Sequence, residues 1–168
     1  MKKDCSPRPI IMLKWLWLSV LILVLDQASK LWVVANFELY ESIALWPSVN
    51  FTYVHNKGAA FSFLSSAGGW QRWFFVLIAV VATTVLLIWL TRLKASEKWM
   101  AITIAMVLGG AIGNLYDRIS YGYVIDFIDV YYQAHHWPVF NIADSAISIG
   151  VVMMLVDAFK TDKSKAAE

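Results

Sequence analysis

Apolar residues gather in four long blocks along the 168-residue chain, and polar stretches separate the blocks. The hydrocarbon core of a bilayer is about 30 Å thick, so a helix needs roughly 20 mainly apolar residues to cross it. The blocks satisfy this length and cover residues 15–34, 73–90, 100–116 and 139–159. We therefore predict an all-α membrane protein, in which residues 1–168 form a single membrane domain with four transmembrane helices.

The connection between the first and second blocks follows a different pattern. Residues 49–54 alternate and are rich in β-branched and aromatic side chains, which predicts a strand. Residues 56–58, Asn-Lys-Gly, are typical of a turn, and the apolar run 59–64 predicts a short element lying at the membrane interface. A small extracytoplasmic β element is therefore expected beside the helices.

The distribution of charged residues predicts on which side of the membrane each connection between the blocks lies. Charged residues make up 15% of the chain, against about a quarter in soluble domains, and the mean hydropathy is +0.60. Ten of the fourteen Lys and Arg residues precede the first block, separate the second from the third, or follow the fourth. Because basic residues favour the cytoplasmic side, we predict cytoplasmic termini and outward-facing connections at about 35–72 and 117–138. The basic residues thus indicate topology, and no nucleic-acid partner is expected.

Two aspartates are the strongest candidates for chemistry. Asp126 follows the third block and Asp144 lies near the start of the fourth, and an ionisable group at membrane depth is a functional-site candidate. In the predicted topology the third helix ends and the fourth begins at the outer face, so both carboxylates belong at one depth. Two carboxylates in a poorly solvated site share a proton, which lets one act as a base and the other as an acid.

Polar residues at helical spacing surround these aspartates. Such stripes cannot face lipid, so we expect them to face each other or a wet cleft that opens outward. Near the outer end of the first block, Asp26 and Lys30 are spaced as an ion pair on one helix face. The stripes comprise Gly110, Asn114, Asp117 and Arg118 in the third block, and Asn141, Asp144, Ser145 and Ser148 in the fourth.

The residues alone leave other functions open. A proton- or cation-coupled carrier would use the same carboxylates, and a scaffold would use polar residues only to join helices. His135 and His136 invite a zinc site, although adjacent histidines lack the one-turn spacing of a helical metal pair. A serine–lysine peptidase could be nominated on Ser29 with Lys30 or on Ser62 with Lys57, but neither pair has a supporting signature.

Several polar residues have simpler expected roles. Asp117 stands next to Arg118, which suggests a local pair. We expect Asp129 to be solvated or interfacial in the outer connection, and His55 to stand alone at the membrane interface.

Five motifs, taken in order, give the chain a family resemblance. The motifs are DQASK at 26–30, NKGAAFSF at 56–63, GGAIGNLYDR at 109–118, VIDF at 124–127 and FNIADS at 140–145. With these motifs the chain resembles bacterial lipoprotein signal peptidase, also called signal peptidase II, an aspartic peptidase of the inner membrane. Each motif is short, but their order along four apolar blocks makes the resemblance specific.

The resemblance implies a substrate and roles for named residues. It implies an aspartic endopeptidase that cleaves prolipoproteins immediately before a cysteine carrying diacylglycerol, with Asp126 and Asp144 as the catalytic dyad. The region around residues 49–64 resembles a cradle and a mobile flap over the site. Further positions match family residues that line or support the site, namely Asn56, Gly58, Asn114, Arg118, Asn141, Asp26 and Lys30.

The resemblance also implies a setting for the reaction. The protein is expected in the bacterial inner membrane as a multi-pass monomer, with its active site near the periplasmic face. Its partners would be prolipoproteins and membrane lipid, and the implied mechanism needs no metal or other cofactor.

Overall fold

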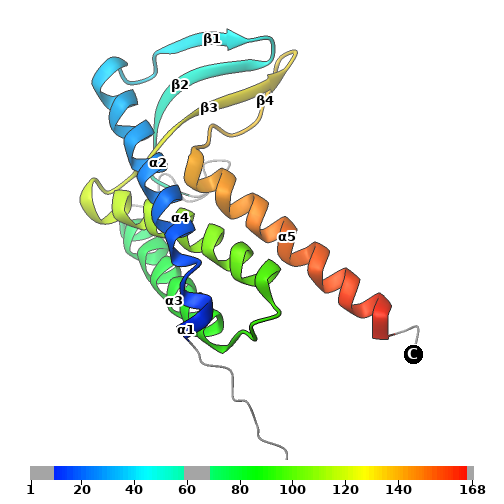
Figure 1. The fold of residues 1–168 in the computed structure, drawn as a ribbon. Helices are drawn as coiled ribbons and strands as arrows, with labels where there is room; N and C mark the ends of the chain where they lie inside the picture. The colour runs from blue at the N-terminus through cyan, green and yellow to red at the C-terminus, as the bar shows by residue number, and fades with distance from the viewer. Residues whose placement is uncertain (1–9, 59–68, 166–168) are drawn as a thin grey trace, which may run out of the picture.

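Four long helices form the body of the protein in the computed structural model, which describes residues 10–58 and 69–165 (Figure 1). Each contains an 18-residue window apolar enough to cross a membrane, so the predicted number of membrane helices is found within the described residues. The predicted interface element at 59–64 lies outside the described residues. The helices are α2 (Leu16–Asn36), α3 (Trp70–Arg92), α4 (Lys98–Ser120) and α5 (Ile142–Lys165), and a short α1 (Ile10–Leu13) precedes them.

The central helix of the bundle is α4, which contacts α2, α3 and α5. Of its apolar window 56% is buried, against 6% for α3, so α4 rather than α3 forms the core. Two glycines permit this close packing. A Cβ on Gly109 would lie 2.8 Å from the carbonyl oxygen of Ser19 in α2, and one on Gly110 would overlap the carbonyl oxygen of Ala143 in α5.

The end of α4 differs from the sequence prediction. The predicted apolar block stops at residue 116, whereas the helix continues to Ser120. The last turn of α4 therefore carries Asp117 and Arg118, in keeping with the polar stripe predicted at helical spacing. The extra turn places Asp117 at 2.8 Å from Lys30 of α2.

A small antiparallel sheet caps one end of the bundle (Figure 1). The strand predicted at 49–54 is confirmed as β2, which extends to Asn56. The second connection also forms strands, which its aromatic composition did not predict. In the order β1-β2-β3-β4, the strands are β1 (Ser42–Trp46), β2 (Val49–Asn56), β3 (Val124–Tyr132) and β4 (His135–His136).

An apolar cluster fixes the sheet to the helices. Val33 near the end of α2 packs with Tyr53 of β2 and with Ile125 and Phe127 of β3, and all four side chains are buried. The ring of Phe51 stacks on that of Phe127, with centroids 5.0 Å apart. This packing holds β3, which carries Asp126, against the outer part of the bundle.

Candidate active site

Asp126 lies near the start of β3 and is 1% exposed. Its Oδ1 accepts a hydrogen bond of 2.6 Å from Nδ2 of Asn141, and its Oδ2 accepts one of 2.9 Å from Nδ2 of Asn56. The first donor precedes α5, and the second ends the neighbouring strand β2. Burial, and then the nearby charge of Asp144, raise the pKa of Asp126 from its ordinary value of 3.8 to about 7.

Asp144 lies in the first turn of α5, where a capping box explains its position. Its backbone N–H donates to Oδ1 of Asn141 at 2.9 Å, and the N–H of Asn141 donates back to Oδ2 of Asp144 at 3.3 Å. Asp144 Oδ1 also accepts a hydrogen bond of 2.7 Å from Nδ2 of Asn114 in α4. The helix start therefore presents this carboxylate toward α4 and β3.

Three asparagines connect the two carboxylates, and each has its amide oriented by a separate donor. Asn141 Oδ1 accepts from the N–H of Asp144, Asn56 Oδ1 accepts from the N–H of Gly58, and Asn114 Oδ1 accepts from the Lys30 ammonium. With the oxygens engaged, the three amide nitrogens are directed at the carboxylates. Asn141 Nδ2 also lies 3.2 Å from Asn114 Oδ1, which closes the network.

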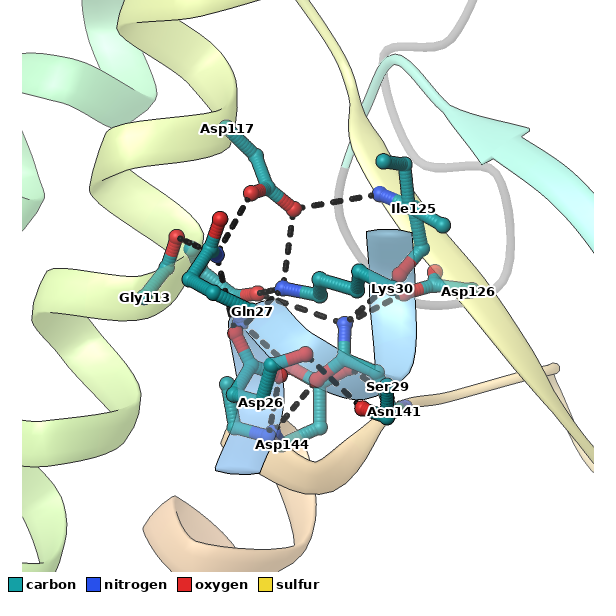
Figure 2. Close-up of polar contacts among 12 residues, drawn as sticks. Asp26, Gln27, Ser29, Lys30, Gly113, Asp117, Ile125, Asp126, Asn141 and Asp144 are labelled. Carbon is teal, nitrogen blue, oxygen red and sulfur yellow. Dashed lines mark hydrogen bonds and ion pairs between the residues drawn. The ribbon is translucent and has the colours of Figure 1, made fainter. Parts of the chain in front are cut away.

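A buried ion cluster supports the asparagines (Figure 2). The Lys30 ammonium is 2.8 Å from Asp26 Oδ2, 2.8 Å from Asp117 Oδ2 and 3.0 Å from Asn114 Oδ1. Lys30 is 1% exposed and both aspartates are fully buried. The predicted pair of Asp26 and Lys30 is thus confirmed, whereas the local pair suggested for Asp117 and Arg118 is wrong, because Asp117 pairs with Lys30 instead.

The ion cluster also holds backbone groups of the elements that carry the two aspartates. Asp26 accepts a 3.0 Å hydrogen bond from the N–H of Ala143, the residue before Asp144. Asp117 accepts one of 3.3 Å from the N–H of Ile125, the residue before Asp126. Gln27, which the sequence did not single out as a site residue, donates to Asp117 Oδ1 at 2.9 Å (Figure 2). The cluster therefore ties α2 and α4 to both acid-bearing elements.

A cavity of about 640 Å³ opens beside Asp144. Arg118 projects into it from α4, donates to the carbonyl oxygen of Gly58 at 3.3 Å and lies over the ring of Phe75 at 5.2 Å. The lining combines a polar side with an apolar one and consists of Asn56, Arg118, Trp137, Pro138, Val139, Phe140, Asp144, Ser145, Ile147, Ser148 and Ile149. Such a lining fits a substrate that has both peptide and apolar parts.

The structure brings Asp126, Asp144 and the seven supporting residues implied by the family resemblance into one network of hydrogen bonds and ion pairs. It also corrects two of the simpler expectations. Asp129 is not solvated: it is 4% exposed and lies 2.8 Å from Nδ1 of His136. His55 does not stand alone, because its Nε2 lies 2.7 Å from the hydroxyl of Tyr53 and its ring stacks on Tyr123, and its place at the membrane interface stays a prediction.

Four apolar helices carry, at one end, a buried and a half-buried carboxylate joined by asparagines, which is a candidate acid–base pair at a membrane-embedded site. Comparison with known proteins gives the family. A family model described as signal peptidase (SPase) II matches residues 18–160. The chain therefore belongs to the lipoprotein signal peptidase family, whose members are proteases of lipoprotein processing.

Individual relatives agree over most of the chain. The lipoprotein signal peptidase of Alteromonas mediterranea is 54% identical over 156 residues, covering 93% of this chain and 86% of the relative. That of Shewanella halifaxensis is 55% identical over 152 residues, covering 90% and 89%. The protein is thus a bacterial membrane enzyme that removes signal peptides from prolipoproteins.

Solved structures support the same fold. A bacterial membrane enzyme solved at 2.3 Å superposes with a TM-score of 0.81 at 29% identity, covering 90% of this chain and 91% of that one. A second, solved at 1.9 Å, gives a TM-score of 0.76 at 30% identity, covering 88% and 93%.

Proposed function

We propose that Asp126 and Asp144 are the catalytic dyad of this peptidase, and that it cleaves prolipoproteins immediately before the diacylglyceryl-modified cysteine. The observation that carries this proposal is the position of Asn141. Its side chain donates to Asp126 at 2.6 Å and accepts from the N–H of Asp144 at 2.9 Å, so one residue holds both acid-bearing elements. The cleavage position is inferred from the family resemblance.

In this mechanism the two carboxylates share one proton. The ionised member removes a proton from water, the water oxygen attacks the scissile carbonyl carbon, and the protonated member gives its proton to the carbonyl oxygen, so that a tetrahedral gem-diol forms. The member that took the proton from water then donates it to the departing amine, and the C–N bond breaks. A hydroxyl of the former gem-diol returns its proton to the other carboxylate, which restores the dyad with one shared proton. The raised pKa of Asp126, near 7, supports a shared proton at physiological pH.

The neighbouring residues have supporting roles in the proposal. Asn56, Asn114 and Asn141 hold the carboxylates by their amide N–H groups, and Asp26 and Lys30 hold Asn114 and the start of α5. Arg118 already donates to two backbone carbonyls, those of Gly58 and Asn114, and its place in the cavity suits it to bind carbonyl oxygens of the substrate. The apolar side of the cavity would receive the lipid chains.

We further propose the orientation that the charges predict, with both termini cytoplasmic and the cavity at the periplasmic face of the inner membrane. Lys94 and Lys98 lie at the junction of α3 and α4, at the end of these helices opposite the sheet (Figure 1). In a Cys5→Ser background, Ser96→Cys should react with a membrane-impermeant thiol reagent only from the cytoplasmic side, and Gln133→Cys only from the periplasmic side. Labelling of each cysteine from the opposite side would contradict the proposed topology.

The single membrane domain is proposed to act as a monomer.

Cleavage of a defined substrate tests the dyad. Purified protein is mixed with a preprotein whose cysteine carries diacylglycerol, and mass spectrometry identifies the new amino terminus. We expect that terminus to be the lipidated cysteine, and we expect the unlipidated preprotein to remain intact. Asp126→Asn and Asp144→Asn should each abolish cleavage, while Asp157→Asn, the same change at the other end of α5, should retain it. Substantial turnover by both dyad variants would remove these residues from the mechanism.

A further inference from the structure

A second buried acid lies in the sheet, outside the proposed dyad. Asp129 of β3 is 4% exposed, and His136 of β4 places Nδ1 at 2.8 Å from its Oδ1 and at 3.0 Å from its Oδ2. Asn50 donates to Asp129 Oδ2 at 3.1 Å, and the Thr52 hydroxyl lies at 3.4 Å from the same oxygen. Burial of a carboxylate is costly unless it is hydrogen-bonded, so these donors explain how Asp129 is accommodated. We call the Asp129–His136 pair the clasp.

The clasp stands at one end of a segment that lines the cavity. Residues 137–140, here called the wall segment, follow His136 directly, and all four line the cavity that contains Asp144. At its far end, Phe140 exchanges backbone hydrogen bonds with Ile128, at 2.8 Å and 3.0 Å. At its near end, the N–H of Trp137 donates to the carbonyl oxygen of Val130 at 2.8 Å. The clasp lies beside this near-end contact.

The clasp adds a side-chain contact to the near end of the wall segment. Pro138, within this segment, has no backbone N–H to donate. His136 is held on both sides, by Asp129 and by the ring of Tyr131, which stacks on it at 5.0 Å. Rotation of His136 out of the clasp would therefore leave the near end with the backbone hydrogen bond between Trp137 and Val130 but without the side-chain contact, while the far end stayed paired with β3.

We infer that Asp129 and His136 are positioning residues for substrate binding, which fix the wall segment so that its apolar side chains meet the apolar part of the lipidated preprotein. The inference rests on the proposed function for the cavity itself. Among the described residues, the oxygens of Asp126 and Asp144 are held by asparagines from other elements and not by the clasp. Loss of the clasp should therefore weaken substrate binding and leave the chemical step unchanged.

Three substitutions distinguish the effect of the hydrogen bond to Asp129 from the effect of the stacked ring of His136. His136→Phe keeps a ring to stack on Tyr131 but removes the donor to Asp129. His136→Asn places an amide nitrogen where Nδ1 stood and restores the donor. His135→Asn is the matched control on the same strand, since His135 is exposed. For His136→Phe we expect KM to rise about threefold to tenfold, the effect of one lost hydrogen bond, with kcat unchanged.

Wild-type KM should return in His136→Asn and persist in His135→Asn. A wild-type KM in His136→Phe, or a fall in kcat with KM unchanged, would overturn the inference, because either result would leave the clasp a purely structural contact. Hydrogen exchange measured without substrate gives an independent reading. The amide of Trp137 should exchange faster in His136→Phe than in the wild type or in His136→Asn, and equal rates would overturn the inference.

The two readouts separate this inference from the proposed function. If the wild-type protein failed to cleave the lipidated preprotein, the proposed function would fall, and hydrogen exchange at Trp137 would still decide whether the clasp fixes the wall segment. If cleavage occurred but His136→Phe changed neither KM nor exchange, only the clasp would be rejected.

Discussion

Replacement of Lys30 by Met removes the one cation between two fully buried carboxylates. Lys30 contacts Asp26 and Asp117, each at 2.8 Å, and Asn114 at 3.0 Å. Removing one partner from a buried ionic group leaves an uncompensated charge and costs about 3–5 kcal/mol. At roughly 2–4 °C per kcal/mol for a chain of this size, the thermal midpoint in detergent should fall by roughly 6–20 °C. Lys94→Met, at an exposed lysine, should leave the midpoint unchanged.

Lys30→Met should also lower activity, because Asn114 loses the donor that orients its amide toward Asp144. Misplacement of a catalytic group by about 1 Å can cost about 100-fold in rate, so we expect kcat to fall on that order. Adding Asp117→Asn removes one unpaired charge and should recover part of the thermal midpoint but not kcat. A wild-type midpoint and kcat in Lys30→Met, or full recovery of kcat in the double variant, would refute this reasoning.

Two further predictions concern packing and pH. A Cβ on Gly113 would lie 2.6 Å from Asp26 Oδ2. Gly113→Ala should therefore displace Asp26, destabilise the protein by about 1–3 kcal/mol and lower the turnover. Unchanged thermal unfolding of this variant would contradict the prediction. The pKa of Asp126, raised to about 7, means that the dyad loses its shared proton as pH rises through that value. The acid that protonates the scissile carbonyl oxygen is then lost, so kcat should fall on the alkaline side with a midpoint near 7. A kcat that is flat from pH 6 to pH 9 would exclude this assignment.

The sequence was sufficient to predict that Asp126 and Asp144 lie near each other, and Asn141 links them in the structure. Asp126 and Asp144 flank the ends of adjacent antiparallel helices, so their common level follows from the order of apolar blocks. The pair of Asp26 with Lys30 follows equally directly from spacing on one helix face. These relations are local or topological and require no knowledge of side-chain packing.

Other features depend on contacts that spacing along the chain does not reveal. Neighbouring residues on a helix point in different directions, so Asp117 faces Lys30 across the bundle instead of its neighbour Arg118. Asp129 was expected in water because it lies in a polar, aromatic connection. Its burial follows from pairing between β2 and β3, where its partner Asn50 is 79 positions away in sequence.

Carbon-13 NMR titration of the Asp126 carboxyl most directly tests whether two acids share one proton. In the wild-type protein we expect this carboxyl to titrate with a pKa near 7. Asp144→Asn removes the neighbouring charge, so it should lower the pKa of Asp126, although burial keeps it above 3.8. Titration of Asp126 near its ordinary pKa in the wild type, or a pKa unaltered by Asp144→Asn, would contradict a shared proton and with it the proposed mechanism.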